Sequence, residues 1–139
     1  MNNNKEESII FIFVDGIGLG DESYANPFYI NPMQLLHDFV PIKLIKNIEY
    51  YDKDITFKGI DACLGIAGIP QSATGQTSLF TGVNAAKLLG YHLTAYPNKI
   101  LINLIHKSSI LKDIIEKGYK ATFANAYTKK YFDLGVSKK

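Results

Sequence analysis

The sequence predicts an α/β fold, a three-layer sandwich with a mostly parallel sheet. Two observations support this prediction. Segments with strand signals alternate with segments that carry helix signals, in the order strand, helix, strand, helix, strand. The first strand segment, Ile9–Val14, is apolar at every position, as expected for a strand with helices on both faces. At 139 residues with 47% hydrophobic content, the chain is expected to form a single domain over 1–139.

The first half of the chain is expected to hold two strands, a loop and a short helix. Residues 1–8 are polar and are expected to form a tail before Ile9–Val14. The segment Asp21–Pro32 contains two Asn-Pro pairs, which break regular structure and predict a loop. Proline suits the first turn of a helix, so a short helix is expected over Met33–Phe39. Ile60–Leu64 is expected to be the second strand.

The second half begins with a glycine-rich connection, Gly65–Gly75. This connection leads into a helix that is expected to start near Gln76 or Thr77. Tyr119–Ala124 is expected to form the third strand, and the polar residues 135–139 a tail.

A second helical region is expected over Lys99–Lys117. Asn98 can cap its first turn, and Gly118 can end its last one. Two neighbouring serines, Ser108 and Ser109, allow the helix to restart within this region.

Composition argues against several classes of partner. The net charge is +2 and the basic residues are spread along the chain, so nucleic-acid binding is not expected. All 15 basic residues are lysines, so the chain cannot supply a planar guanidinium to clamp a phosphate.

Cys63 is the single cysteine, which excludes an internal disulfide and fits a reducing compartment. The apolar run Ser8–Val14 is too short to span a membrane, so a cytoplasmic protein is expected.

Asp15 is the first candidate site residue. It directly follows the first predicted strand and precedes two glycines, Gly16 and Gly18. Open α/β sheets bind their ligands at the carboxyl ends of strands. A carboxylate held there, with room for the backbone beside it, suits a hard or borderline cation. Asp15 is therefore a candidate metal ligand, and the structural alternative is that it caps the following turn.

The second candidate site is Gly75-Gln76-Thr77, at the predicted helix start. Free N–H groups and the positive end of the dipole at a helix N-terminus favour a bound phosphoryl oxygen. Gln76 could donate a hydrogen bond to that group. A threonine hydroxyl is a weak nucleophile, so Thr77 would need a metal ion or a base to activate it. The structural alternative is that Thr77 is an ordinary N-cap.

Two nucleotide-binding motifs are excluded. A P-loop needs four residues between its glycines and a lysine after the second glycine. Gly68 and Gly75 enclose six residues and are followed by Gln76. The glycines after Asp15 do not have the spacing of a dinucleotide-binding fingerprint, and its carboxylate would repel a pyrophosphate.

The segment Gly65–Lys87 resembles the nucleophile region of the alkaline phosphatase superfamily. The similar branch contains cofactor-independent phosphoglycerate mutase and phosphopentomutase. The matching motifs are Asp15-Gly16 after a strand, Gly68-Ile69-Pro70, and Gly75-Gln76-Thr77. Phe123-Ala124-Asn125-Ala126-Tyr127 is similar to a motif of bacterial metalloenzyme-domain proteins. The resemblance spans most of the chain, from Ile9 to Phe132.

The resemblance implies a metal-dependent phosphate-ester hydrolase or phosphomutase that acts on a small phosphorylated substrate. Thr77 would be transiently phosphorylated, and Asp15 and Thr77 would be ligands of two divalent metal ions, manganese or zinc. Gly75 and Gln76 would contact the substrate phosphate. Three nearby hydroxyls rank below Thr77, because they do not match the nucleophile position: Ser72, Thr74 and Ser78.

The chain departs from the family in its supply of metal ligands. A two-metal site needs roughly six or seven protein ligands, and the family takes most of them from a later segment with Asp-His pairs. This chain has three histidines and no Asp-His pair. His92, in the loop after the predicted nucleophile helix, is the one histidine considered as a candidate near the site, whereas His37 and His106 are expected in helices.

The chain is therefore expected to be the N-terminal part of the fold and to be inactive alone. A missing C-terminal segment would cover its sheet, or the exposed sheet edge would lead to self-association. The alternative is a non-catalytic remnant or a phosphate-binding module that lacks the full metal set.

Overall fold

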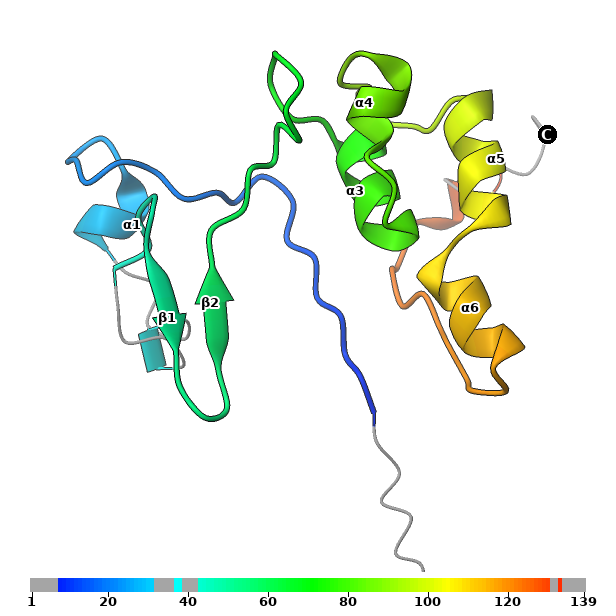
Figure 1. The fold of residues 1–139 in the computed structure, drawn as a ribbon, viewed down its shortest axis with the longest axis horizontal. Coiled ribbons are helices and arrows are strands. Elements are labelled where there is room, and N and C mark those ends of the chain that lie inside the picture. The colour runs from blue at the N-terminus through cyan, green and yellow to red at the C-terminus, as the bar shows by residue number, and fades with distance from the viewer. Residues whose placement is uncertain (1–7, 32–36, 39–42, 131–132, 134–139) are drawn as a thin grey trace, which may run out of the picture. The chain divides into compact units, whose positions relative to one another are not determined.

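The computed structural model describes residues 8–31, 37–38, 43–130 and 133 (Figure 1). Helices and strands both occur, which agrees with the coarse α/β class. The chain forms two compact units, Met1–Ala62 and Cys63–Lys139.

The first unit contains helix α1, Pro27–Ile30. The proline at its first position has the φ that a helix needs and no N–H to leave unpaired. Asn26 caps the helix, because its side chain accepts the Phe28 N–H at 3.1 Å. The same side chain donates to the Asp21 carbonyl at 3.0 Å. An added Cβ at Gly20 would lie 2.8 Å from this carboxamide, so a larger residue there would have to displace the Asn26 side chain.

Strands β1, Glu49–Tyr51, and β2, Thr56–Lys58, form an antiparallel hairpin in the same unit (Figure 1). The Asp52 carboxylate closes the turn between them. Its Oδ1 accepts the Asp54 N–H at 2.8 Å and the Ile55 N–H at 2.7 Å. A side chain that binds its own turn in this way offsets the cost of ordering a short hairpin.

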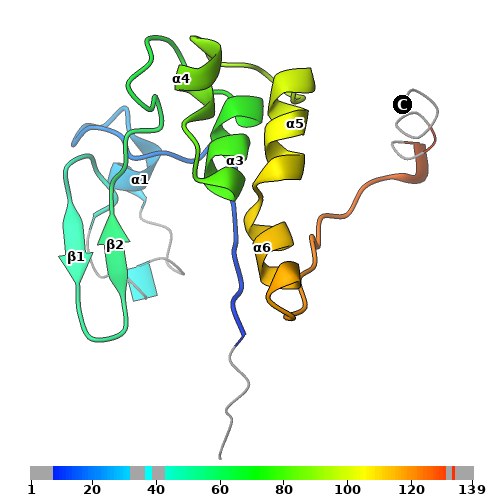
Figure 2. The same ribbon diagram turned by 45° about the vertical axis from the view of Figure 1, so that its right-hand side comes forward.

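The second unit is built around helix α3, which contacts α4, α5 and α6 (Figures 1 and 2). The bounds of these helices are α3 Ser72–Thr81, α4 Ala85–Leu89, α5 Lys99–Lys107 and α6 Ile110–Glu116. Small side chains at the contacts allow the helices to approach closely. The core consists of the buried residues Ala73, Ala85 and Leu101, with Leu89 and Leu93 packed against them.

Polar caps determine where two of these helices begin. The Asn98 side chain accepts the Leu101 N–H at 3.1 Å, and the Ser109 hydroxyl accepts the Lys112 N–H at 3.3 Å. The predicted cap at Asn98 and the predicted restart at Ser109 are confirmed. Gly118, with a φ of +86°, follows the end of α6, also as predicted.

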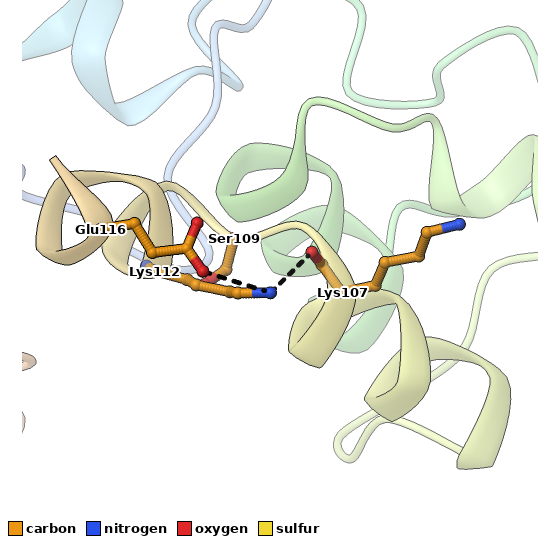
Figure 3. Close-up of polar contacts among 4 residues, drawn as sticks. All are labelled: Lys107, Ser109, Lys112 and Glu116. Atoms are coloured by element: carbon orange, nitrogen blue, oxygen red, sulfur yellow. Dashed lines mark hydrogen bonds and ion pairs between the residues drawn. The ribbon is translucent and has the colours of Figure 1, made fainter.

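Lys112 links α5 and α6 at this junction (Figure 3). Its ammonium group donates to the Lys107 carbonyl at 3.3 Å, in the last turn of α5, and lies 3.7 Å from the Glu116 carboxylate. The ammonium group of Lys107 points away from this cluster (Figure 3). A cation beside the last carbonyls of a helix favours that helix end. Because Lys112 and Glu116 are exposed, their ion pair itself contributes little.

The three segments predicted as strands do not form strands in the structure. Within the described residues, Ile9–Val14 and Tyr119–Ala124 are not part of a strand, and Ile60–Leu64 runs into a turn. A strand is stabilised by ladder hydrogen bonds to a neighbouring strand, so apolar composition alone does not make a segment a strand. The described sheet is two-stranded and antiparallel rather than parallel, apart from an isolated parallel bridge between Gly20 and Ile45.

The helix predicted over Met33–Phe39 and the two predicted polar tails lie mostly outside the described residues. Across the ranges that are described, no helix is both long and apolar enough to cross a lipid bilayer.

Candidate functional site

Helix α3 begins earlier than the sequence predicts. Its first residue is Ser72 and its N-cap is Gln71, so the predicted start near Gln76 is wrong. The Ala73 N–H, in the first turn, donates to the Leu93 carbonyl at 3.2 Å. This bond satisfies one of the N–H groups that a helix start leaves unpaired. Because its acceptor comes from a distant part of the chain, no local signal marks this start.

The earlier start changes what the predicted site residues can do. Gly75 and Gln76 lie inside α3, and the Gly75 N–H donates to the Gln71 carbonyl at 2.9 Å. That N–H is therefore used within the helix. Thr77 also lies inside the helix, so neither the N-cap role nor the anion-binding helix start applies to it.

Two other hydroxyls of α3 hold the helix in place. The Thr74 hydroxyl donates to the Gln71 carbonyl at 3.2 Å and accepts the Leu93 N–H at 3.3 Å. The Ser78 hydroxyl donates to the Thr74 carbonyl at 2.8 Å and accepts the Ala85 N–H at 3.0 Å. Both hydroxyls are used by the fold, so a reaction at either would break hydrogen bonds.

Thr77 differs from these neighbours. Its carbonyl accepts the Thr81 hydroxyl at 2.7 Å, but within the described residues its own hydroxyl has no hydrogen-bond partner. The Thr77 residue is 2% exposed. No fully buried side-chain N or O atom in the described ranges lacks a partner, so the Thr77 hydroxyl oxygen keeps some contact with solvent. A ligand that engages this hydroxyl breaks no hydrogen bond among the described residues.

Two side chains hold the glycine-rich connection before α3. Asn84 Nδ2 donates to the Leu64 carbonyl at 2.8 Å, and His92 Nε2 lies 3.0 Å from the Ile66 carbonyl. Asn84 also caps α4, because its Oδ1 accepts the Lys87 N–H at 2.8 Å. His92, the one histidine considered as a candidate near the site, therefore uses Nε2 to hold the backbone of this connection.

Asn84 is a positioning residue that the sequence reasoning missed. Its capping role had a signal, because an asparagine directly before Ala85-Ala86-Lys87-Leu88-Leu89 is typical of a helix start. No sequence signal indicated its hydrogen bond to the Leu64 carbonyl, because the two residues are far apart in the sequence.

Asp15 lies in the first unit, at an exposed turn. Gly16 follows it with a φ of +76°, a left-handed conformation that favours glycine. An open cavity of about 520 Å³ lies beside this turn and is lined by residues between Gly16 and Phe28. The glycines that follow Asp15 thus leave space next to the turn.

The described residues do not form a metal centre by themselves. Within residues 8–31, 37–38, 43–130 and 133, no group of three or more His, Cys, Asp or Glu side chains could hold a metal ion. The predicted ligands Asp15 and Thr77 belong to the first and second unit respectively. They fit only part of a two-metal site, which needs several more carboxylate or imidazole ligands.

Comparisons with known proteins identify no relative. No protein-family model matches the chain, and no curated protein or solved structure is significantly similar to it. The functional proposal therefore depends on the site residues and their contacts.

Proposed function

We propose that this chain is the nucleophile-bearing part of a metal-dependent phosphate-ester hydrolase or phosphomutase, with Thr77 as the nucleophile. The main support for the proposal is the environment of the Thr77 hydroxyl. This hydroxyl is held on a packed helix, keeps contact with solvent and has no hydrogen-bond partner within the described residues. The resemblance of Gly65–Lys87 to the alkaline phosphatase superfamily indicates the same residue.

The proposed reaction transfers a phosphoryl group from a small substrate to Thr77. The hydroxyl oxygen gives its proton to a water molecule and bonds to phosphorus, while the ester oxygen leaves with the bonding electron pair and takes up a proton from water. Transfer from the resulting phosphothreonine to water makes a hydrolase, and transfer to a second hydroxyl makes a mutase.

Gly75 and Gln76 are the proposed contacts to the substrate phosphate. Gln76 is half-buried and carries an amide that can donate to a phosphoryl oxygen. An added Cβ at Gly75 would meet nothing within 4 Å, so this position leaves open space on the helix. This open space is the reason to propose that Gly75 contacts the phosphate, because the Gly75 N–H already donates to a carbonyl within the helix.

Two divalent ions, manganese or zinc, would supply the positive charge that favours a threonine alkoxide. Asp15 and Thr77 are the ligands proposed from this chain. A further segment or a partner chain would supply the others, because the described donors are too few. The chain alone is therefore expected to be inactive.

We also propose the sheet arrangement and the cellular location of the complete enzyme. In that enzyme, Ile9–Val14, Ile60–Leu64 and Tyr119–Ala124 would be strands of a mostly parallel sheet in a three-layer sandwich. A cytoplasmic location agrees with the lone Cys63, which cannot form an internal disulfide.

Metal binding tests the role of Asp15. Free Mn²⁺ would be followed by electron paramagnetic resonance as the ion is added to the native chain, to Asp15→Asn and to Asp54→Asn. Asp54 is also an exposed carboxylate in a turn of the first unit, so it is a matched control. Asp15→Asn is expected to weaken binding at least about tenfold, and Asp54→Asn to leave it unchanged. Equal affinities would remove Asp15 from the site.

Hydrolysis of an aryl phosphate with added Mn²⁺ or Zn²⁺ tests the nucleophile. Any activity of the native chain, alone or with a complementing segment, is expected to be lost in Thr77→Val. Thr94→Val is the control, because Thr94 is an exposed threonine whose hydroxyl donates to the Gln71 side chain at 3.1 Å. A phosphothreonine at position 77, detected by mass spectrometry, would support the proposal. Activity that survives in Thr77→Val would overturn it.

The alternative is a non-catalytic remnant or phosphate-binding module. Binding of inorganic phosphate that persists in the presence of a chelator, and that is equal in Asp15→Asn, would favour this alternative. Phosphorus NMR line widths measure such binding directly.

A further inference from the structure

Two neighbouring residues, His92 and Leu93, hold the two segments that meet at the start of α3. They lie in the chain between α4 and α5 (Figures 1 and 2). His92 Nε2 lies 3.0 Å from the Ile66 carbonyl, in the connection over residues 63–70. Both backbone groups of Leu93 bind the first turn of α3, through the Ala73 N–H and the Thr74 hydroxyl. The connection and the helix start are therefore fixed to the same two residues.

The connection has a backbone conformation that needs such support. Three of its residues have a positive φ: Leu64 at +54°, Gly65 at +74° and Gly68 at +121°. A leucine in this conformation is strained, because its Cβ comes too close to the neighbouring carbonyl oxygen. Strained residues persist only where the surrounding structure holds them. The His92 ring lies close to this backbone, since an added Cβ at Gly68 would be 3.3 Å from its Cδ2 atom.

We propose that His92 is a positioning residue, which acts through the Ile66 carbonyl to hold α3, and with it Thr77, in place. Because Leu93 directly follows His92, the bond to Ile66 also limits how far the Leu93 backbone can move from the helix start. The part of this inference that concerns Thr77 rests on the proposed function, whereas the hold on α3 does not.

The same bond fixes the tautomer of His92. A carbonyl oxygen can only accept a hydrogen bond, so Nε2 of the ring carries a proton. In a neutral imidazole the other nitrogen, Nδ1, is then unprotonated. His92 is therefore the Nε2–H tautomer whenever the ring is neutral.

Nitrogen NMR of the imidazole rings tests the tautomer. In the native full-length chain at about pH 8, where an ordinary histidine is neutral, the ring shifts of His92 are expected to show a protonated Nε2 and an unprotonated Nδ1. His106 is the internal comparison, because it is exposed on α5 and its ring is expected to exchange between both tautomers. An unprotonated Nε2 in His92 would overturn the proposal.

Hydrogen exchange at the Ala73 amide tests the hold on α3. This N–H donates to the Leu93 carbonyl, so it reports on the helix start. His92→Leu is expected to speed its exchange at least about tenfold. His92→Gln is expected to restore slow exchange, because the glutamine N–H reaches about as far from the backbone as Nε2 of histidine. His92→Asn is too short to do so, and the control His106→Leu should exchange at the native rate.

The glutamine variant decides between a donated hydrogen bond and simple packing. Equal exchange in His92→Gln and His92→Leu would overturn the proposal, and so would a native rate in His92→Leu. If His92→Leu does not fold, faster exchange in His92→Asn than in His92→Gln supports the proposal and equal rates overturn it. Neither measurement depends on phosphoryl transfer. A failed hold on α3 would leave the activity test of Thr77→Val valid, and a failed Thr77 assignment would leave both results for His92 standing.

Discussion

The Leu93 N–H donates a hydrogen bond of 3.3 Å to the hydroxyl of Thr74. The Leu93 carbonyl in turn accepts the Ala73 N–H at 3.2 Å, so both backbone groups of Leu93 hold the first turn of α3. Thr74 is fully buried, at 0% exposed. Thr77, on the same helix, is nearly as buried but has no hydroxyl partner in the described part of the chain. The Thr74 hydroxyl therefore stabilises the fold, whereas the Thr77 hydroxyl makes no hydrogen bond within the described residues.

Replacing each of these threonines by valine is expected to have different effects on stability. Thr74→Val leaves the Leu93 N–H without its acceptor and is expected to lower the free energy of unfolding by about 1–3 kcal/mol. Thr77→Val removes no hydrogen bond among the described residues and keeps the side-chain shape, so a change within about 0.5 kcal/mol is expected. Urea unfolding followed by circular dichroism measures both. Equal losses would mean that the Thr77 hydroxyl also has a structural partner.

Alanine at two glycines of the second unit is expected to change stability in opposite directions. Gly75 lies inside α3 with nothing within 4 Å of an added Cβ, so Gly75→Ala is expected to stabilise the protein by about 0.5–1 kcal/mol. Gly82 has equal space but a φ of +69°, so Gly82→Ala is expected to destabilise it by roughly 1–2 kcal/mol. Thermal unfolding compares the two. A destabilised Gly75→Ala would show that the position is more crowded than the structure indicates.

Two substitutions at Asn84 are expected to separate its two contacts. Asn84→Ala removes both the cap on the Lys87 N–H and the bond to the Leu64 carbonyl, with an expected loss of about 1–3 kcal/mol. Asn84→Asp keeps an oxygen for the cap but has no N–H for Leu64. Limited proteolysis of the connection over residues 63–70 is expected to accelerate in both variants. Protection equal to the native chain in Asn84→Asp would mean that the Leu64 bond does not hold this connection.

The β1–β2 hairpin is expected to weaken in acid. The N–H groups of Asp54 and Ile55, followed by the Tyr50 hydroxyl, hold the pKa of Asp52 below its ordinary value of 3.8. A carboxyl whose folded pKa is lowered contributes stability above its unfolded pKa, and this contribution is lost as the pH falls through the folded pKa. Cross-strand NMR contacts should therefore decline below about pH 4 in the native chain.

Two alanine variants check the source of this acid response. Asp52→Ala should have a weakened hairpin at every pH and little further response to acid. Asp54→Ala, which keeps the backbone donor and the Asp52 carboxylate, should retain the native response. An unchanged acid response in Asp52→Ala would assign the effect to another group, such as Glu49, whose pKa is lowered by the Tyr51 hydroxyl and by Lys58.

The sequence by itself determined those helix ends that depend on nearby residues. Asn98 and Ser109 each accept an N–H only three residues later, and Gly118 takes a left-handed φ that other residues adopt with strain. Such signals act within one turn, so they can be read from a short stretch of chain. The resemblance that singles out Asp15 and Thr77 also comes from the sequence, and their joint role stays a prediction.

Only the tertiary structure decided where α3 begins and which of its hydroxyls are used. The Leu93 backbone and the Ala85 N–H reach α3 from later parts of the chain, so no local pattern announces them. Strand formation at Ile9–Val14 depends in the same way on a partner, because a strand is stabilised by ladder bonds to another segment. Helix caps are local interactions, whereas strand pairing and hydroxyl use depend on contacts that only the folded chain or its assembly provides.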